Sequence, residues 1–374
     1  MKGKVTQEKI HSIEFLRTLF CLTVIFYHVT MGSIIPYTNG NAFYKWCSSA
    51  FANSGFVVEC FFIISGYFLM ASFRRRPDAS VLRFLALKVR RLWPVFLVST
   101  IITHFMTHGI WTESIVNSLF LQMTGLTFSF RGTNWYVSSM FWSLVFYFLL
   151  LKCVRDRYRR CFAVLLVSWA AYAINLQTHA PCGFGREVVF GFLSLGLLRG
   201  IAGVGLGILL NEFVEAARPY FERRLDWRIV LLSTALELLA ASLLTAHLFF
   251  RGWTCKSHFI VVVAFAILLP LLVLRGGLVS RLLDCKALGI LGKYTYSMYV
   301  MQQAGFWILQ KTLWPDTAFV TEHVGPTLVI SVAVPAAVGV VAYYLIELPG
   351  ARLIDAIGGL LIARGQEKEN VNVR

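Results

Sequence analysis

Two ionisable side chains in the first apolar stretch of the sequence are spaced so that they could act on one ligand. The stretch IEFLRTLFCLTVIFYHV contains Arg17 and His28, which are eleven residues apart. In a helix they would lie within roughly 20° of one face and about 16 Å apart along the axis. This spacing favours a ligand that runs along the helix. The alternative is that Arg17 snorkels to the membrane interface while His28 makes an interhelical hydrogen bond.

A carboxylate in the second apolar stretch is expected to face His28. Glu59 lies in VECFFIISGYFLM, at a depth similar to that of His28 when residues are counted from the outer ends of the two stretches. A carboxylate that faces an imidazole fixes its tautomer and raises its basicity, as a general base requires. The alternative is a buried charge pair with a purely architectural role.

A third ionisable residue, Arg199, is predicted near the middle of the sixth apolar stretch, in FLSLGLLRGIAGVGLG. A buried arginine needs a carboxylate or a phosphate as its partner. The glycines that follow it would let a bulky ligand or a neighbouring helix approach closely.

A basic segment, RRRPDASVLRFLALKVRRLWP, connects the second and third apolar stretches. Its seven positive charges could bind anionic lipid or a polyphosphate ligand, and lipid binding together with topology is the default explanation for most of them. Pro94 at its end is expected in the first turn of the next helix.

A polar and aromatic triplet, Asn134, Trp135 and Tyr136, opens the fourth apolar stretch at its outer edge. An aromatic belt at the membrane interface is the ordinary structural explanation for such residues, and stacking against a bound sugar is the functional alternative. The eight cysteines show no CxxC spacing and no Cys/His cluster, so neither a metal site nor a disulfide framework is predicted.

The composition of the chain indicates the kind of structure in which these residues lie. The 374 residues are 57% hydrophobic and 14% charged, with a mean hydropathy of +0.67. These values exclude a secreted enzyme, a nucleic-acid-binding module and a disordered chain. They predict an all-α, polytopic transmembrane bundle of about ten spans. The spans are expected near 13–35, 50–71, 92–111, 134–152, 161–178, 187–210, 229–250, 258–274, 289–311 and 326–348.

The basic residues predict the orientation of this bundle. With both termini placed in the cytoplasm, the inside loops hold 26 of the 35 Lys and Arg residues, and the outside loops hold only Lys45, Arg131, Arg186, Arg251 and Lys256. The other four, Arg17, Arg199, Lys293 and Lys311, lie within or at the ends of spans. Residues 1–364 are predicted to form one membrane domain, with 365–374 as a short polar cytoplasmic tail.

Several separated motifs resemble those of the acyltransferase-3 family of integral membrane proteins, which includes bacterial O-acetyltransferases that act on surface glycans. Arg17 and His28 reproduce the family's Arg and His with ten residues between them. Glu59 with the following FFIISG is similar to its acidic residue and FFxxSG. The other matches are Arg90, Arg91 and Pro94 (RRxxP), Trp135 and Tyr136 (the WY pair), LGKYTYSMY from Leu291 to Tyr299, and IELP from Ile346 to Pro349.

The resemblance runs in order over nearly the whole chain, with three departures. Gln302 stands where many members have a histidine three residues after the tyrosine of the ninth span, and Met140 stands where some have an acid. Longer members also carry an esterase-like domain outside the membrane, which this sequence lacks. The acceptor is therefore expected to reach the membrane itself, or a separate partner protein completes onward transfer.

The resemblance implies transfer of an acyl group, with acetyl as the expected one, from cytoplasmic acyl-CoA to a hydroxyl of a surface glycan or glycolipid. His28, oriented by Glu59, would act as general base or as an acyl relay. Arg17, Arg90, Arg91, Arg199 and Lys293 would pair with the phosphates of the acyl-CoA. Asn134, Trp135 and Tyr136 would contact the acceptor. Acyl-CoA is expected as a substrate, with no permanently bound cofactor, no metal and no nucleic acid partner.

Two other functions compete with this one. A multi-pass transporter or flippase for a glycan precursor could use the same intramembrane residues as a substrate pathway or proton relay. A noncatalytic partner of a polysaccharide synthase is the third interpretation. All three place the chain in a cell membrane, with a bacterial cytoplasmic membrane favoured.

Overall fold

The computed structural model describes residues 10–125, 134–178, 187–224, 226–249 and 258–358. Within them the chain is almost entirely helical, as its composition predicts, and a single pair of short antiparallel strands, β1 and β2, is present. The elements are α1 His11–His28, α2 Ala42–Ala50, α3 Val57–Arg75, α4 Val81–Thr107, α5 Trp111–Ser118, α6 Trp135–Cys153, α7 Arg157–Gln177, β1 Val188–Val189, β2 Leu193–Ser194, α8 Leu195–Arg224, α9 Trp227–Phe249, α10 His258–Leu274, α11 Leu278–Leu283, α12 Lys286–Gly289, α13 Thr295–Lys311, α14 Thr317–Glu322 and α15 Val324–Ala342.

Seven helical stretches of the described residues are long and apolar enough to cross a membrane. They are 11–33, 42–75, 135–153, 157–177, 195–223, 227–249 and 324–358. Helix α10 is apolar but shorter, while α4 and α13 coincide with predicted spans without joining this set. The chain is a multi-pass membrane protein; ten spans and cytoplasmic termini stay predictions.

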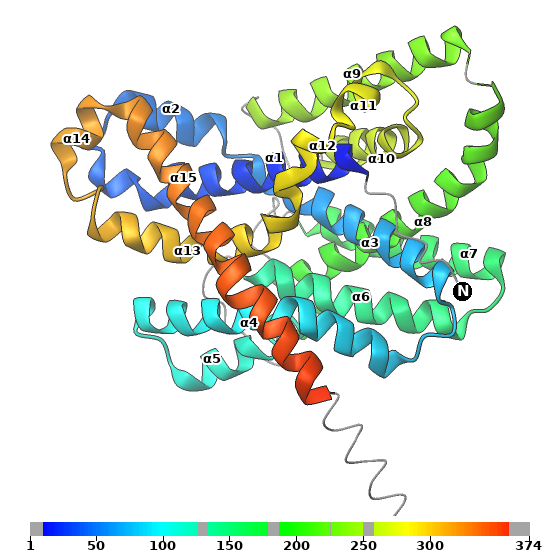
Figure 1. Ribbon diagram of the computed structural model, residues 1–374, viewed down its shortest axis with the longest axis horizontal. Helices are drawn as coiled ribbons and strands as arrows, with labels where there is room; N and C mark the ends of the chain where they lie inside the picture. The colour runs from blue at the N-terminus through cyan, green and yellow to red at the C-terminus, as the bar shows by residue number, and fades with distance from the viewer. Residues whose placement is uncertain (1–9, 126–133, 179–186, 225, 250–257, 359–374) are drawn as a thin grey trace, which may run out of the picture.

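In the view of Figure 1, α2, α4, α6 and α13 lie roughly parallel to α1. Helix α1 crosses the middle of the molecule from beside α12 to beside α2, and α15 runs obliquely across one side toward α4. Along its length α1 packs against α10, α13 and α15. The hydrophobic core joins side chains of nearly all of these helices, so the bundle has one continuous apolar interior.

Helix α4 corrects the expectation that Pro94 opens a new helix. The helix begins at Val81, where Ser80 caps it by accepting a hydrogen bond from the backbone N–H of Arg83. It then continues through Pro94 to Thr107. The basic segment and the apolar stretch after it are therefore one helix, in which Pro94 is an interior residue against which Gly350 packs closely.

Helix α8 also differs from the expected boundaries. The predicted span began at residue 187, but 187–194 contains the two strands and a turn in which Phe190 and Gly191 have positive φ angles of 55° and 76°. The helix starts only at Leu195, which places Arg199 near its beginning instead of its middle.

Glycines bring α3 and α8 into direct backbone contact, as the glycine-rich sequence of α8 predicts. A Cβ atom on Gly66 of α3 would overlap the backbone of Val204, and one on Gly207 of α8 would overlap the backbone of Ile63. Only glycine allows such an approach of two helix backbones.

At one end of this pair, Glu212 of α8 is the centre of a cluster of arginines. Its carboxylate lies 2.9 Å from Arg157, 3.3 Å from Arg74 and 3.6 Å from Arg160. Because Arg74 belongs to α3 and Arg157 and Arg160 to α7, these ion pairs join three helices. We refer to this end of the bundle, which the basic residues predict to be cytoplasmic, as the basic end.

Most basic residues predicted in outside loops cannot be compared with the structure. Lys45 lies in α2. Arg131, Arg186, Arg251 and Lys256 lie outside the described residues, as do Lys2, Lys4, Lys9 and the tail 365–374.

Candidate active site

Glu59 and Arg199 form a buried ion pair at the end of the bundle opposite the basic end. The Glu59 carboxylate lies 3.3 Å from Nε of Arg199 and accepts a hydrogen bond of 2.9 Å from the hydroxyl of Tyr172. Arg199 also donates to the backbone oxygen of Gly55 at 3.3 Å, and its guanidinium lies 5.5 Å from the ring centre of Trp135. Four helices, α3, α6, α7 and α8, thus contribute to one charged cluster, which we call the Glu59 cluster.

The Glu59 cluster differs from the expected arrangement, in which Glu59 faced His28. Within the described residues no hydrogen bond or ion pair joins Glu59 to His28. Both carboxylate oxygens are used by Tyr172 and Arg199 instead. Matching depth along two helices did not specify the rotation of either helix about its axis, and that rotation turns Glu59 toward α7 and α8.

His28 is the last residue of α1 and is followed directly by a π-helical segment, Val29–Ser33. Its ring is partly buried and lies 5.1 Å from that of Tyr27. In the described part of the chain its ring nitrogens make no hydrogen bond. Single π-helical turns occur often at functional sites. Helix α1 contacts the turn Ser54–Phe56, which also supplies the Gly55 oxygen to Arg199, so this turn connects α1 to the Glu59 cluster.

Arg17 lies in a second cluster toward the basic end. It forms an ion pair of 3.0 Å with Glu14, and both side chains are largely buried, with 18% of each exposed. Glu14 in turn packs against Gly292. Arg91 of α4 is within electrostatic reach of Glu14, Arg17 and Glu347. We call these side chains the Arg17 cluster.

Glu347 connects the end of the chain to the Arg17 cluster. It closes a second π-helical segment, Tyr343–Glu347, and accepts a short hydrogen bond from Ser297 of α13. The Arg17 cluster therefore joins residues from four of the motifs that the sequence analysis singled out, whereas the Glu59 cluster joins the other two.

The remaining predicted phosphate-binding cations have different surroundings. Arg90 forms an exposed ion pair of 2.8 Å with Asp355. The ammonium of Lys293 lies 4.6 Å from the ring centre of Tyr294 and about 6 Å from two further tyrosines, Tyr343 and Tyr344. Arg91 is exposed and has no ion-pair partner in the described ranges.

Aromatic side chains fill the space between the two clusters. The Tyr136 ring lies 4.8 Å from that of Phe62 and 5.3 Å from that of Tyr299. Its hydroxyl lies 3.3 Å from the sulfur of Met140. Gln302, where many family members have histidine, is fully buried and donates to the backbone oxygen of Tyr299 at 2.7 Å.

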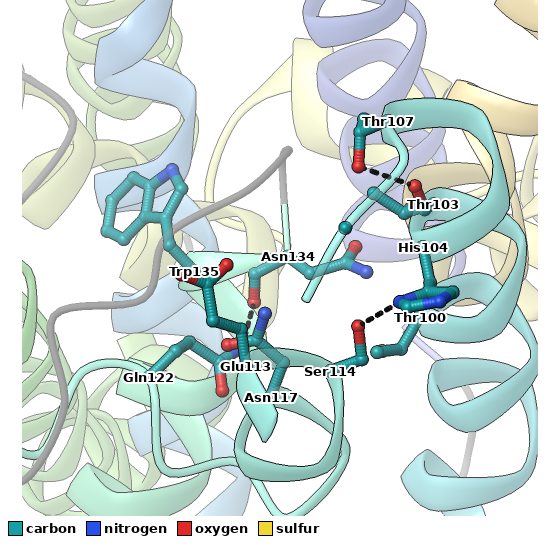
Figure 2. A pocket seen from close by; sticks show the side chains of 11 residues that line it. Thr100, Thr103, His104, Thr107, Glu113, Ser114, Asn117, Gln122, Asn134 and Trp135 are labelled. Carbon is teal, nitrogen blue, oxygen red and sulfur yellow. Dashed lines mark hydrogen bonds between the residues drawn. The ribbon is translucent and has the colours of Figure 1, made fainter. Parts of the chain in front are cut away.

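A polar pocket opens beside the Glu59 cluster, between α4, α5 and the start of α6 (Figure 2). Its empty volume is about 420 Å³, including space open to solvent. Asn134 and Trp135, both predicted to contact the acceptor, line it. Tyr136 points elsewhere, toward Phe62.

The sequence analysis missed the other residues of this pocket. Figure 2 shows His104 of α4 beside Ser114 of α5, with 2.8 Å between Nδ1 and the hydroxyl oxygen. One face of α4 carries polar side chains at positions i, i+3, i+4 and i+7, which are Thr100, Thr103, His104 and Thr107. That polar stripe in an apolar helix was a signal that could have identified the pocket.

The described residues contain no group of three or more His, Cys, Asp or Glu side chains that could hold a metal ion. The candidate site consists of His28, the Glu59 cluster, the Arg17 cluster and the polar pocket.

Comparison with known proteins identifies the family. A family model described as an acyltransferase domain, acyltransferase-3, matches residues 10–346, nearly the whole chain. No curated protein and no solved structure matches. The matched region includes the Glu59 cluster, His28, the polar pocket and all of the Arg17 cluster except Glu347. The chain therefore belongs to the acyltransferase-3 family of membrane proteins.

Proposed function

We propose that the protein transfers an acyl group, acetyl in the simplest case, from acyl-CoA to a hydroxyl of a glycan or glycolipid. The observation that carries this proposal is that α1 runs unbroken from Arg17 in the Arg17 cluster to His28 at its other end. A long, thin donor with phosphates at one end and a thioester at the other fits that separation of about 16 Å.

The basic end supports binding of the phosphates. Arg91 is exposed and without an ion-pair partner in the described part of the chain, and it lies near Arg17. Guanidinium groups bind phosphate through paired, charge-assisted hydrogen bonds. Arg90 and Lys293 are proposed to contribute less, because Asp355 and the tyrosines already engage them. The pairing of Arg199 with Glu59 supports a positioning role for Arg199 in place of contact with acyl-CoA.

His28 is proposed as the general base. Its neutral imidazole takes the proton of the acceptor hydroxyl as the oxygen attacks the thioester carbonyl, because an un-ionised alcohol is a weak nucleophile. The carbon–sulfur bond then breaks, and the imidazolium returns its proton to the departing thiolate. The products are an ester and free coenzyme A. The Glu59 cluster would fix the helices around the acceptor.

The test measures release of free coenzyme A from acetyl-CoA by the purified protein in lipid nanodiscs, with and without a membrane glycolipid extract. His28→Ala should abolish release, and Arg17→Ala should weaken it. His323→Ala, a change at an exposed histidine away from both clusters, is the control and should retain release.

Two outcomes would contradict the proposal. Normal release by folded His28→Ala protein would remove His28 from the reaction. Absence of both coenzyme A release and acyl-CoA binding in folded wild-type protein would favour transport of a glycan precursor instead.

A further inference from the structure

Three side-chain amide oxygens in the polar pocket have no hydrogen-bond donor in the described structure. They belong to Asn117, Gln122 and Asn134. Gln122 and Asn134 are only 6% and 7% exposed. A buried acceptor without a donor costs free energy, and these three oxygens are acceptors that hydroxyl groups of a bound molecule could satisfy.

The orientation of two of these amides follows from their partners. The nitrogen of Gln122 donates to the backbone oxygen of Asn134 at 3.3 Å. The nitrogen of Asn134 lies 3.2 Å from the hydroxyl of Ser99, which donates its own hydrogen to the backbone oxygen of Val300. Because a backbone oxygen only accepts and the Ser99 hydrogen is already used, both amides must present NH₂ to these partners. Their oxygens are therefore left for the pocket.

The rest of the wall is also rich in acceptors. The hydroxyl of Thr100 donates to the backbone oxygen of Phe96 in its own helix at 2.9 Å, so toward the pocket it offers lone pairs. Glu113 adds a carboxylate at the partly exposed side. Gln122 and Asn134, on the buried side, are uncharged.

We propose that this pocket binds the edge of an uncharged sugar unit, whose adjacent hydroxyls donate to Asn117, Gln122 and Asn134, and that it rejects sugars bearing a carboxylate. This inference rests on the proposed function, because it makes the pocket the subsite that selects the glycan acceptor. An anionic sugar would place its carboxylate against the amide oxygens and the Glu113 carboxylate, which would repel its negative charge.

The pocket is connected to the charged cluster by one side chain. Trp135 lines the pocket, and its ring lies against the guanidinium of Arg199. A sugar held in the pocket would therefore be next to the Glu59 cluster.

Binding can be tested without any acyl donor. Saturation-transfer NMR would be recorded on the protein in nanodiscs with the methyl glycosides of glucose and galactose and with the matched methyl glucuronide and methyl galacturonide. At least one neutral glycoside should bind, and the uronide matched to it should bind about tenfold more weakly or not at all. Gln122→Met and Asn117→Leu should each weaken the neutral glycoside about tenfold.

Gln302→Met is a matched control. Like Gln122, Gln302 is buried, donates to a backbone oxygen and leaves its own oxygen without a donor, but it does not line the pocket. This variant should bind the neutral glycoside as wild type does.

Three results would overturn the subsite: no neutral glycoside binds folded wild-type protein, uronides bind equally well, or both pocket variants keep wild-type affinity. Its failure is separate from that of the proposed function. Glycoside binding that depends on Gln122 would leave the subsite standing even if coenzyme A release proved independent of His28. Release of coenzyme A that depends on His28, without any glycoside binding, would support the proposed function and overturn the subsite.

Discussion

The carboxylate of Glu59 and the guanidinium of Arg199 lie 3.3 Å apart with almost no exposure, 2% and 8% of their side chains. This pair connects α3 to α8. Tyr172 connects α7 to the pair as well, because its hydroxyl donates a hydrogen bond to Glu59. The charges neutralise each other in a place where either alone would be costly.

Loss of one partner of this pair should destabilise the protein strongly. Arg199→Met and Glu59→Gln each leave the other charge buried and unpaired, so each should lower the free energy of unfolding by about 3–5 kcal/mol. Thermal unfolding in detergent would measure the change. The double variant should recover part of the loss, because neither charge then remains unpaired. Single variants as stable as wild type would contradict a stabilising role for the pair.

The contact between α3 and α8 should not tolerate a side chain in place of glycine. Gly66→Ala places a methyl group against the backbone of Val204, which should cost about 1–3 kcal/mol of stability. The control is Gly325→Ala in α15, where no atom lies within 4 Å of the added carbon. Thermal unfolding should give a clearly lower melting temperature for Gly66→Ala than for Gly325→Ala. Equal melting temperatures would mean that the two helices can move apart without a loss of stability.

The two ends of α1 should affect different kinetic constants. On the proposed function, Arg17→Ala should raise KM for acyl-CoA with a smaller effect on kcat, whereas His28→Ala should lower kcat by about 10²–10⁴. Steady-state rates at varied acyl-CoA concentration would show the difference. A His28→Ala variant with wild-type kcat and raised KM would instead make His28 a binding residue.

Neighbouring arginines in α4 should respond differently to the same substitution. Arg91→Ala should weaken acyl-CoA binding about tenfold, since Arg91 is exposed and lies near Arg17. Arg90→Ala should have little effect, because it removes an exposed ion pair with Asp355, which is worth at most about 1 kcal/mol. Titration of each variant with acyl-CoA would compare them, and a larger loss for Arg90→Ala would reverse this assignment.

The sequence predicted the helices better than their contacts. Each predicted apolar run overlaps a helix, and the position of Arg17 and His28 on one unbroken helix is confirmed. Hydrophobic runs and spacing along one helix are local properties, which explains this success.

The partner of Glu59 could not be predicted, because it depends on how α3, α7 and α8 rotate against one another. The extent of α4 was wrong for another reason. Pro94 suggested a helix start, but Ser80 caps the helix earlier and the chain continues through the proline. The polar pocket depends on the turn between α4 and α5, which brings Ser114 back to His104; span prediction ignores such turns.

The glycine contact between α3 and α8 has a mechanical consequence. The backbones touch at Gly66 and Gly207, and ion pairs to Glu59 and Glu212 join the two helices near their ends, so this pair is expected to move as one body. Helix α1, with Arg17 and His28, is not part of that body. Any relative movement of helices during substrate entry and product release is therefore expected at contacts other than the one between α3 and α8.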